Sequence, residues 1–94
     1  MRSTWDAAKN RLNLRRHGIA FEDATRIFDG PVEKLDDRLD YGEIRIYAVG
    51  LLNGVEITVI YTDRKNDTRH LISAWKSAPH EKRAFWEELA GQAD

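Results

Sequence analysis

Four residues near the ends of an apolar, strand-like segment carry side chains that could act on a phosphate. They are Arg64, Arg69, His70 and Lys76. Cations anchored at the ends of a strand have limited freedom, and several of them near one point can stabilise a phosphate oxyanion. The alternative is a short strand whose charged ends are simply solvated, since charged residues commonly stand at strand ends.

Length and composition restrict the class of protein. The 94 residues predict one domain, residues 1–94, with one modest hydrophobic core. The chain has no cysteine, which excludes a disulfide framework and a thiolate nucleophile. No charge-free apolar run approaches the ~20 residues that span a bilayer, and no signal peptide follows Met1. We therefore expect a cytoplasmic protein with no membrane partner.

Charge is distributed unevenly along the chain, although the formal net charge is only −1. Residues 1–17 carry five Lys or Arg side chains against one Asp, whereas residues 22–43 carry eight acidic side chains against three basic ones. Residues 44–76 are basic again, with five basic side chains against three acidic ones. If the two basic segments fold together, they form a positive patch that attracts phosphate. The alternative is a mixture of charges that serves only solubility.

The first third of the chain predicts two helices. Asp6 is suited to cap a helix over residues 7–17, and Gly18 is suited to end it. A shorter helix is expected over residues 21–28, where apolar residues recur at helical spacing.

The first helix also carries candidate functional side chains. Lys9 and Arg16 fall at helical spacing along the edge of its buried stripe, so their stems can pack while their charged ends face outward. His17 follows at the helix end, where the helix dipole favours the charged imidazole.

The middle of the chain predicts β-strands. Residues 33–43 are acidic and indicate an edge strand or a loop, because Asp is a poor strand former. Apolar and polar residues then alternate with a period of two over residues 44–49 and 55–61. Asn53-Gly54 between these runs favours a type I′ hairpin, because both residues tolerate positive φ angles.

A third strand over residues 69–76 and a final helix capped by Ser77 complete an α+β plan. Strict alternation along this strand predicts one face that carries His70, Ile72, Ala74 and Lys76. The other face would carry Arg69, Leu71, Ser73 and Trp75. His70 and Lys76 are therefore expected on the same side.

Other chemistries have little support. Three carboxylates lie close in sequence, at Asp36, Asp37 and Asp40, but they have no known metal-loop spacing. Ser73 falls inside a predicted strand and not on a nucleophile turn. A P-loop and a dinucleotide-binding fingerprint are also absent.

Motifs along nearly the whole chain resemble those of the BrnT toxin family. They are Trp5-Asp6-x-x-Lys9, Arg16-His17-Gly18-x-x-Phe21-x-x-Ala24, Ile27-Phe28-Asp29-Gly30-Pro31, Asp36-Asp37-Arg38-x-Asp40-Tyr41-Gly42-Glu43, Tyr61-Thr62-x-Arg64, Ile72-Ser73-Ala74 and Glu81. The resemblance implies a RelE-like α+β fold with two N-terminal helices, an antiparallel sheet of three to four strands and a C-terminal helix. It also implies a metal-independent, cofactor-free ribonuclease of a type II toxin–antitoxin system. The implied partners are RNA and a BrnA-type ribbon-helix-helix antitoxin, which alone would contact DNA.

The implied reaction assigns a role to each candidate residue. The RNA 2′-hydroxyl attacks the adjacent phosphate and needs a base, a charge stabiliser and an acid. Arg64 would hold the phosphate with Arg69 and Lys76, while His70 would transfer a proton. The remaining candidates are His17 and Lys9 as catalytic helpers, Arg16 and Trp75 as RNA-binding residues, and Glu81 as a residue that orients a cation.

The chain departs from many relatives beside the Ser73-Ala74 motif. Where they carry arginine, this sequence has His70 before the motif and Trp75 after it. Trp75 could stack on an RNA base or cover the final helix. The alternative function is a binding protein of little or no activity, which pairs with a DNA-binding antitoxin and modulates operator occupancy.

Overall fold

The central hairpin of the fold follows from the Asn53-Gly54 turn. In the computed structural model, which describes residues 1–92, β3 (Glu43–Leu52) and β4 (Val55–Arg64) are antiparallel neighbours. Asn53 and Gly54 have φ angles of 51° and 79°, and a type I′ turn requires positive φ at both positions. The predicted hairpin is confirmed.

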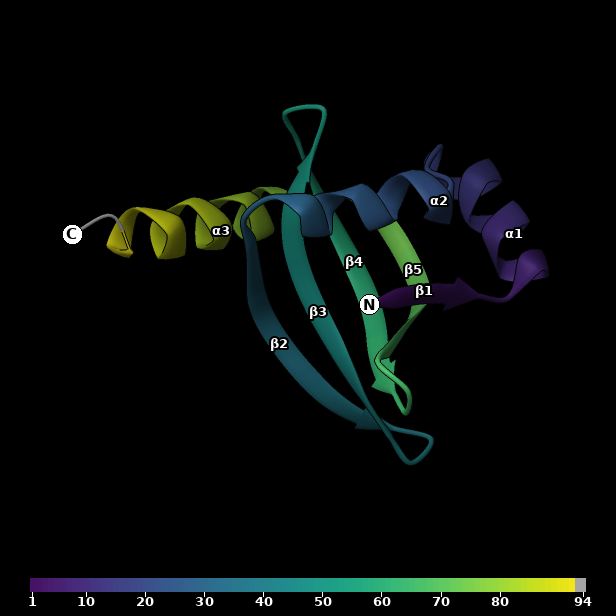
Figure 1. Ribbon diagram of the computed structural model, residues 1–94. Helices are drawn as coiled ribbons and strands as arrows, with labels where there is room; N and C mark the ends of the chain where they lie inside the picture. Colours follow the sequence, from purple (N-terminus) through teal and green to yellow (C-terminus); the bar gives the residue numbers. More distant parts are fainter. Residues whose placement is uncertain (93–94) are drawn as a thin grey trace.

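Five strands form one mixed sheet in the order β1-β5-β4-β3-β2 (Figure 1). β5 (Thr68–Lys76) is antiparallel to β4, whereas β1 (Arg2–Trp5) pairs in parallel with the other edge of β5. The α+β class is confirmed. The predicted arrangement, two helices and then an antiparallel sheet of three to four strands, is wrong, because β1 precedes the first helix. Its four residues are too few to show an alternating pattern.

The acidic segment forms a complete edge strand, β2 (Val32–Asp40), which pairs with β3. Its side chains form ion pairs along the strand, Lys34 with Asp37 at 3.2 Å and Arg38 with Asp36 at 2.8 Å. An edge strand tolerates such charges because they face water, and they discourage pairing with another chain.

The first helix, α1 (Ala7–His17), has the predicted bounds. The Asp6 carboxylate accepts a hydrogen bond from the Lys9 N–H at 2.9 Å, which caps the first turn. Gly18 ends the helix with a φ of 70°, a conformation that favours glycine. Both predicted helix boundaries are confirmed.

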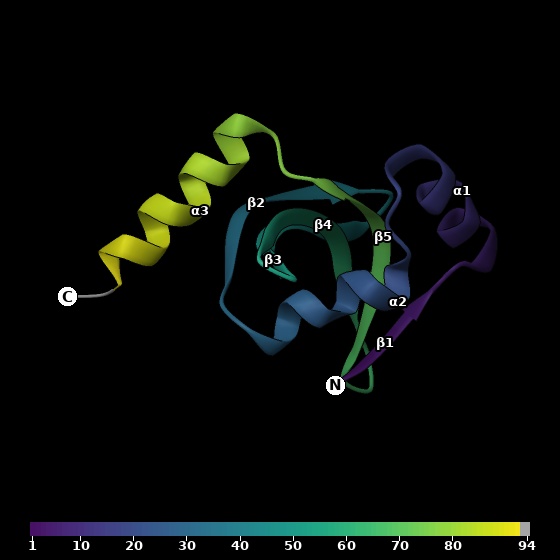
Figure 2. The ribbon, with the colours of Figure 1, turned by 90° about the horizontal axis from the view of Figure 1, so that it is seen from above.

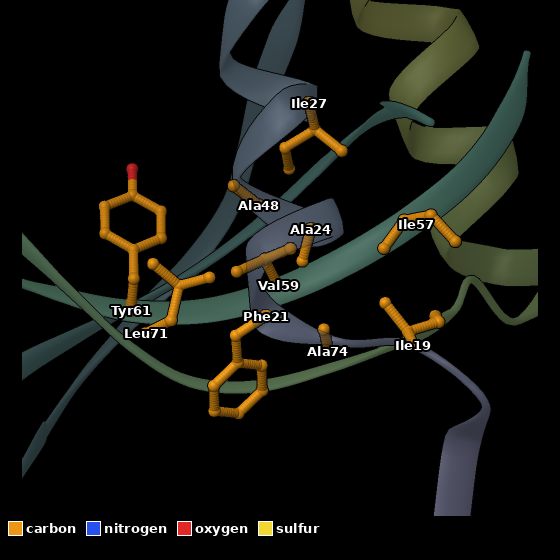
Figure 3. Packing of buried hydrophobic residues seen from close by; sticks show 10 residues of the cluster. All are labelled: Ile19, Phe21, Ala24, Ile27, Ala48, Ile57, Val59, Tyr61, Leu71 and Ala74. Atoms are coloured by element: carbon orange, nitrogen blue, oxygen red, sulfur yellow. The ribbon is translucent and has the colours of Figure 1, made fainter. Parts of the chain in front are cut away.

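One face of the sheet, here called the helical face, is covered by α2 (Phe21–Ala24) and the 3-10 helix η1 (Thr25–Asp29). Together they replace the single helix predicted over residues 21–28. Gly50 on β3 lets η1 approach closely, because a Cβ atom there would lie 2.7 Å from Ile27 Cβ. The hydrophobic core lies between these helices and the sheet (Figure 3). Its fully buried side chains include Phe21, Ile27, Val59 and Leu71.

The opposite face of the sheet, here called the outer face, is partly covered by α3 (Pro79–Gly91), on which Phe85 is fully buried. The N-cap of α3 is Ala78, not Ser77 as predicted, because the Ser77 hydroxyl is hydrogen-bonded to Thr58 Oγ1 at 2.7 Å. Figure 2 shows α3 beside β2, one edge of the curved sheet, and α1 on the opposite side, near β5.

A bulge at Ile72 changes which face the β5 side chains occupy. Ser73 pairs with Ile60 and Leu71 pairs with Tyr61, so Ile72 has no partner on β4. The outer face therefore carries His70, Ser73 and Trp75. The helical face carries Arg69, Leu71, Ala74 and Lys76. The expectation that His70 and Lys76 share a face is wrong, since the sequence shows no sign of the extra residue.

No helix within residues 1–92 is both long and apolar enough to cross a membrane.

Candidate active site

An open hollow of about 160 Å³ lies where α1 packs against β5. Lys9, Arg16 and His17 line it from α1, and Ile72 and Ser73 line it from β5. The bulge contributes here, because it lets two consecutive β5 side chains face α1. The structure thus brings together three of the predicted cationic or proton-carrying residues.

Asn13 fixes α1 against the edge of β5. The pairing of β1 with β5 stops at Leu71, and farther along the same edge the Asn13 amide takes the place of a strand. Its Nδ2 donates to Ala74 O at 2.8 Å, and its Oδ1 accepts from the Ala74 N–H at 3.1 Å. Nδ2 also donates to Ile19 O at 2.9 Å. Sequence reasoning missed this role, because nothing in the sequence distinguishes Asn13 from an exposed polar helix residue.

His70 lies on the outer face, and β1 holds its ring. Its Nδ1 lies 2.9 Å from Thr4 Oγ1, and the two residues are partners in the parallel pairing of β1 with β5. Partial burial lowers the pKa of His70, and the positive charges of Arg64 and Lys9 lower it further, against the opposing effects of Glu43 and Asp6. The neutral imidazole is therefore favoured at pH 7. Thr4 was missed from the sequence, because it lies in the short strand that showed no pattern.

Arg64, at the end of β4, lies on the same face as His70. Its guanidinium donates to Glu43 Oε1 through Nη2 at 2.9 Å and through Nε at 3.2 Å. The Arg64 side chain is 46% exposed, so water screens this ion pair and the pair contributes little to stability. A phosphate can therefore compete with Glu43 for the guanidinium.

Trp75 lies against His17, with 6.3 Å between the ring centroids. Trp75 Nε1 donates to Glu81 Oε1 at 3.0 Å, and the same oxygen accepts from the Ala78 N–H at 2.7 Å. The Glu81 residue is only 7% exposed. Glu81 thus holds an indole ring and the first turn of α3, and not the cation that was expected.

Arg69 is separated from His70, because neighbouring strand residues point to opposite faces. On the helical face its Cζ lies 3.6 Å from the ring centroid of Phe28 and 5.1 Å from that of Tyr61. These are cation–π contacts at the edge of the core.

Lys76 is also distant from His70. It pairs with Ile57, whereas His70 pairs with Thr62, five steps farther along β4. Five steps correspond to roughly 16 Å along a strand. Of the three cations expected to bind one phosphate, only Arg64 shares a face with His70.

His70 and Arg64 on the outer face, and the side chains that line the hollow, are of types suited to proton transfer beside a phosphate. A neutral imidazole can accept a proton, and guanidinium and ammonium groups can stabilise phosphate oxygens. Within the described part of the chain, no cluster of three or more His, Asp or Glu residues is placed to hold a metal ion.

The described part of the chain is thus a small α+β protein that gathers cationic and imidazole side chains where α1 meets β5. A family profile described as "Ribonuclease toxin, BrnT, of type II toxin-antitoxin system" matches residues 5–81. The chain therefore belongs to the BrnT family of ribonuclease toxins, and membership in a type II system implies an antitoxin partner.

The fold is also similar to a crystal structure of the ribonuclease toxin BrnT from Brucella abortus. The two chains are 25% identical, with a TM-score of 0.68, and the match covers 83% of this chain and 99% of that chain. No protein with curated annotation matches this sequence.

Proposed function

We propose that this protein is a metal-independent endoribonuclease that inhibits growth by cleaving RNA in the cytoplasm, and that residues 1–94 act as a single domain. One observation carries the proposal: the His70 imidazole is held by Thr4 on the same face as Arg64, and partial burial with the charges of Arg64 and Lys9 lowers its pKa. A neutral imidazole near cations suits 2′-hydroxyl activation beside a phosphate.

His70 acts as the base in this mechanism. When Thr4 Oγ1 accepts a hydrogen bond from Nδ1–H, the Nε2 lone pair is free to take the proton of the 2′-hydroxyl. The 2′-oxygen then attacks the adjacent phosphorus as the bond from phosphorus to the 5′-oxygen breaks. The products carry a 2′,3′-cyclic phosphate and a 5′-hydroxyl.

The other residues of the site support this step. Arg64 and Lys9 stabilise the charge that builds up on the phosphate oxygens. His17, in the hollow, supplies the proton to the leaving 5′-oxygen. Arg16 attracts the RNA backbone, and Trp75 stacks on a base while Glu81 holds its indole ring. Arg69 and Lys76 have no part in this mechanism, since both lie on the helical face.

The proposed partner is a BrnA-type antitoxin with a ribbon-helix-helix domain. The family implies an antitoxin, and this type would make the DNA contacts of the complex. The toxin itself then meets DNA only indirectly.

Expression in bacteria tests the function. The protein produced alone should arrest growth, and the product of the neighbouring reading frame should relieve the arrest. Both His70→Ala and Arg64→Ala should abolish arrest, while Lys76→Ala, a matched change on the other face, should retain it. Circular dichroism of each purified variant shows whether the fold is kept. If the folded His70→Ala variant still arrests growth, the assigned base is wrong, and if the wild type causes no arrest, the binding-protein alternative is favoured.

A further inference from the structure

We propose that Arg38 and Arg45 form a second RNA-binding subsite on the outer face, which holds phosphates of nucleotides flanking the cleaved bond. This inference rests on the proposed function, because it extends the His70 site. The ligand is single-stranded RNA that extends beyond the two nucleotides joined by the cleaved bond.

The strand register places the two arginines in line with His70. Arg38 pairs with Arg45 across β2 and β3. The β3–β4 pairing ends with Ile46 opposite Tyr61. Arg45 immediately precedes Ile46 and Thr62 immediately follows Tyr61, so the same register places Arg45 across from Thr62. Thr62 pairs with His70 on β5. One row of outer-face side chains thus runs across the sheet from Arg38 to His70.

The length of this row suits a nucleic acid strand. Three strand spacings separate β2 from β5, and each spacing is about 4.8 Å, which gives roughly 14 Å. A stacked strand rises about 3.4 Å per nucleotide, so the row spans several nucleotides. A substrate that reaches His70 and continues across the sheet would pass both arginines.

The Arg38–Arg45 pair itself needs an explanation. Like charges directly opposite each other destabilise an antiparallel sheet. Each arginine has a separate carboxylate partner, Asp36 at 2.8 Å from Arg38 and Asp40 at 2.8 Å from Arg45. These carboxylates reduce the repulsion between the two arginines. An uncharged residue at either position would remove the repulsion entirely, so the pair is better explained by a ligand that needs both cations.

The two guanidinium groups retain donors for a ligand. Arg38 donates to Asp36 through Nε, so this ion pair does not occupy its two Nη groups. Arg45 contacts Asp40 through Nη1. Its Nε is buried and has no hydrogen-bond partner in the described part of the chain, so a ligand would reach this guanidinium at its Nη end. Both ion pairs are at least partly exposed, so phosphate oxygens can compete with the carboxylates.

Aromatic rings lie beside both arginines. The Arg38 Cζ is 4.6 Å from the centroid of the Tyr47 ring, and the Arg45 Cζ is 5.6 Å from that of Tyr41. Tyr41 is 90% exposed, so its ring is available to a base. Proteins that bind single strands combine cations for the backbone with aromatic rings for the bases.

A hollow of about 350 Å³ provides room next to this row. Arg38 and Tyr47 line it from the sheet, and His80 and Glu81 line it from α3. Because Glu81 also holds Trp75, the hollow adjoins the residue proposed to stack on a base. The His70 site, Trp75 and the two arginines therefore belong to one side of the molecule.

Binding of an uncleavable RNA tests the subsite. The probe is a fluorescent single-stranded RNA with methylated 2′-hydroxyls, long enough to cross the sheet, compared with a trinucleotide of the same chemistry. The double variant Arg38→Gln/Arg45→Gln should bind the long RNA about tenfold more weakly at low salt, and the slope of log K against log salt should fall by about 0.7 per lost phosphate contact. Binding of the trinucleotide should not change.

Arg26→Gln is the matched control, because Arg26 is an exposed arginine on η1 whose Nη2 donates to Asn53 Oδ1 at 3.1 Å. It loses one positive charge outside the row, as Arg38→Gln loses one within it, and should bind both RNAs like the wild type. The single variant Arg38→Gln, at a side chain that is 63% exposed, retains the test if the double variant does not fold.

The outcomes separate this subsite from the active site. His70→Ala should stop cleavage yet bind the long RNA normally, so a failure of the assigned base leaves the binding result intact. If the arginine variants bind the long RNA like Arg26→Gln, the subsite is overturned. If they keep RNA binding but lose the antitoxin, the row is a protein interface and the proposal is also overturned.

Discussion

The two faces of the sheet use their charged residues in opposite ways. On the helical face, Arg69 stacks on Phe28 and Tyr61 and closes the edge of the core. On the outer face, the next residue along the chain, His70, is held by Thr4 and remains partly exposed beside Arg64. One strand therefore supplies a structural cation to one face and a reactive group to the other.

The difference shows that residue type alone does not assign a role. A guanidinium that stacks on two aromatic rings has lost much of its contact with water and serves packing. An imidazole whose pKa is lowered by partial burial and nearby cations is suited to accept protons. The face that a side chain occupies decides between these outcomes.

Replacing His70 should have the largest effect on activity. His70→Ala removes the proposed base, and removal of a general base typically lowers a rate by about 10²- to 10⁴-fold. The rate of RNA cleavage by purified protein measures this effect. A thermal unfolding curve close to that of the wild type would show that the loss is chemical, whereas a variant with wild-type rates would place the base elsewhere.

Replacing Arg64 should have a smaller effect. Arg64→Gln removes a charged hydrogen bond to the phosphate, which corresponds to about 10- to 100-fold in the cleavage rate. Lys76→Gln is the control, since Lys76 lies on the helical face, and it should keep the wild-type rate. Equal losses in the two variants would contradict the separation of the faces.

Arg69→Ala should reverse this pattern, by lowering stability and sparing cleavage. Loss of its stacking on two rings should reduce the free energy of unfolding by about 1–2 kcal/mol. Urea unfolding measures the change, and Arg11→Ala, at an exposed position on α1, should stay within about 0.5 kcal/mol of the wild type. A stable Arg69→Ala protein that no longer cleaves RNA would assign Arg69 to catalysis.

Thr4→Val should cause a modest loss of activity. It removes the hydrogen bond that orients His70. Loss of a neutral hydrogen bond should lower the cleavage rate by about 2- to 12-fold. Thr25→Val makes the same chemical change on η1 and should leave the cleavage rate unaltered. If the two variants have equal rates, Thr4 does not position the base.

Stability should depend on pH through His70 by a small amount. Its pKa is lowered in the folded state, so between that value and the ordinary pKa of about 6.5 the unfolded chain binds more protons. The contribution of His70 to the free energy of unfolding is therefore fully present above about pH 6.5 and is lost as the pH decreases through this window. Urea unfolding at several pH values should show a weaker dependence in His70→Gln, and an identical dependence would contradict the shift.

Much of the scaffold could be predicted from local signals. Asp6, Gly18 and the Asn53-Gly54 turn each impose a backbone geometry on their own neighbours, and all three act as expected. The family motifs likewise identified the family. Such signals need no knowledge of distant parts of the chain.

The features that sequence reasoning missed depend on distant pairings. β1 exists because the edge of β5 is available to it, and Asn13 is buried because that edge continues past Leu71. The bulge at Ile72 is visible only in the register with β4. Because of it, residues before Ile72 and residues after it do not occupy the faces that strict alternation predicts for them together. For this reason Lys76 lies on the opposite face from His70, contrary to the prediction, while Lys9, Arg16 and His17 on one helix stayed together.

The chemical nature of the RNA ends shows whether the 2′-hydroxyl is the nucleophile. Purified protein is incubated with single-stranded RNA in the presence of a chelator, and the termini of the products are determined by mass spectrometry. We expect 2′,3′-cyclic phosphate and 5′-hydroxyl ends with the wild type, and no products with His70→Ala. Products with 5′-phosphate ends, or cleavage that stops when the chelator is added, would contradict it.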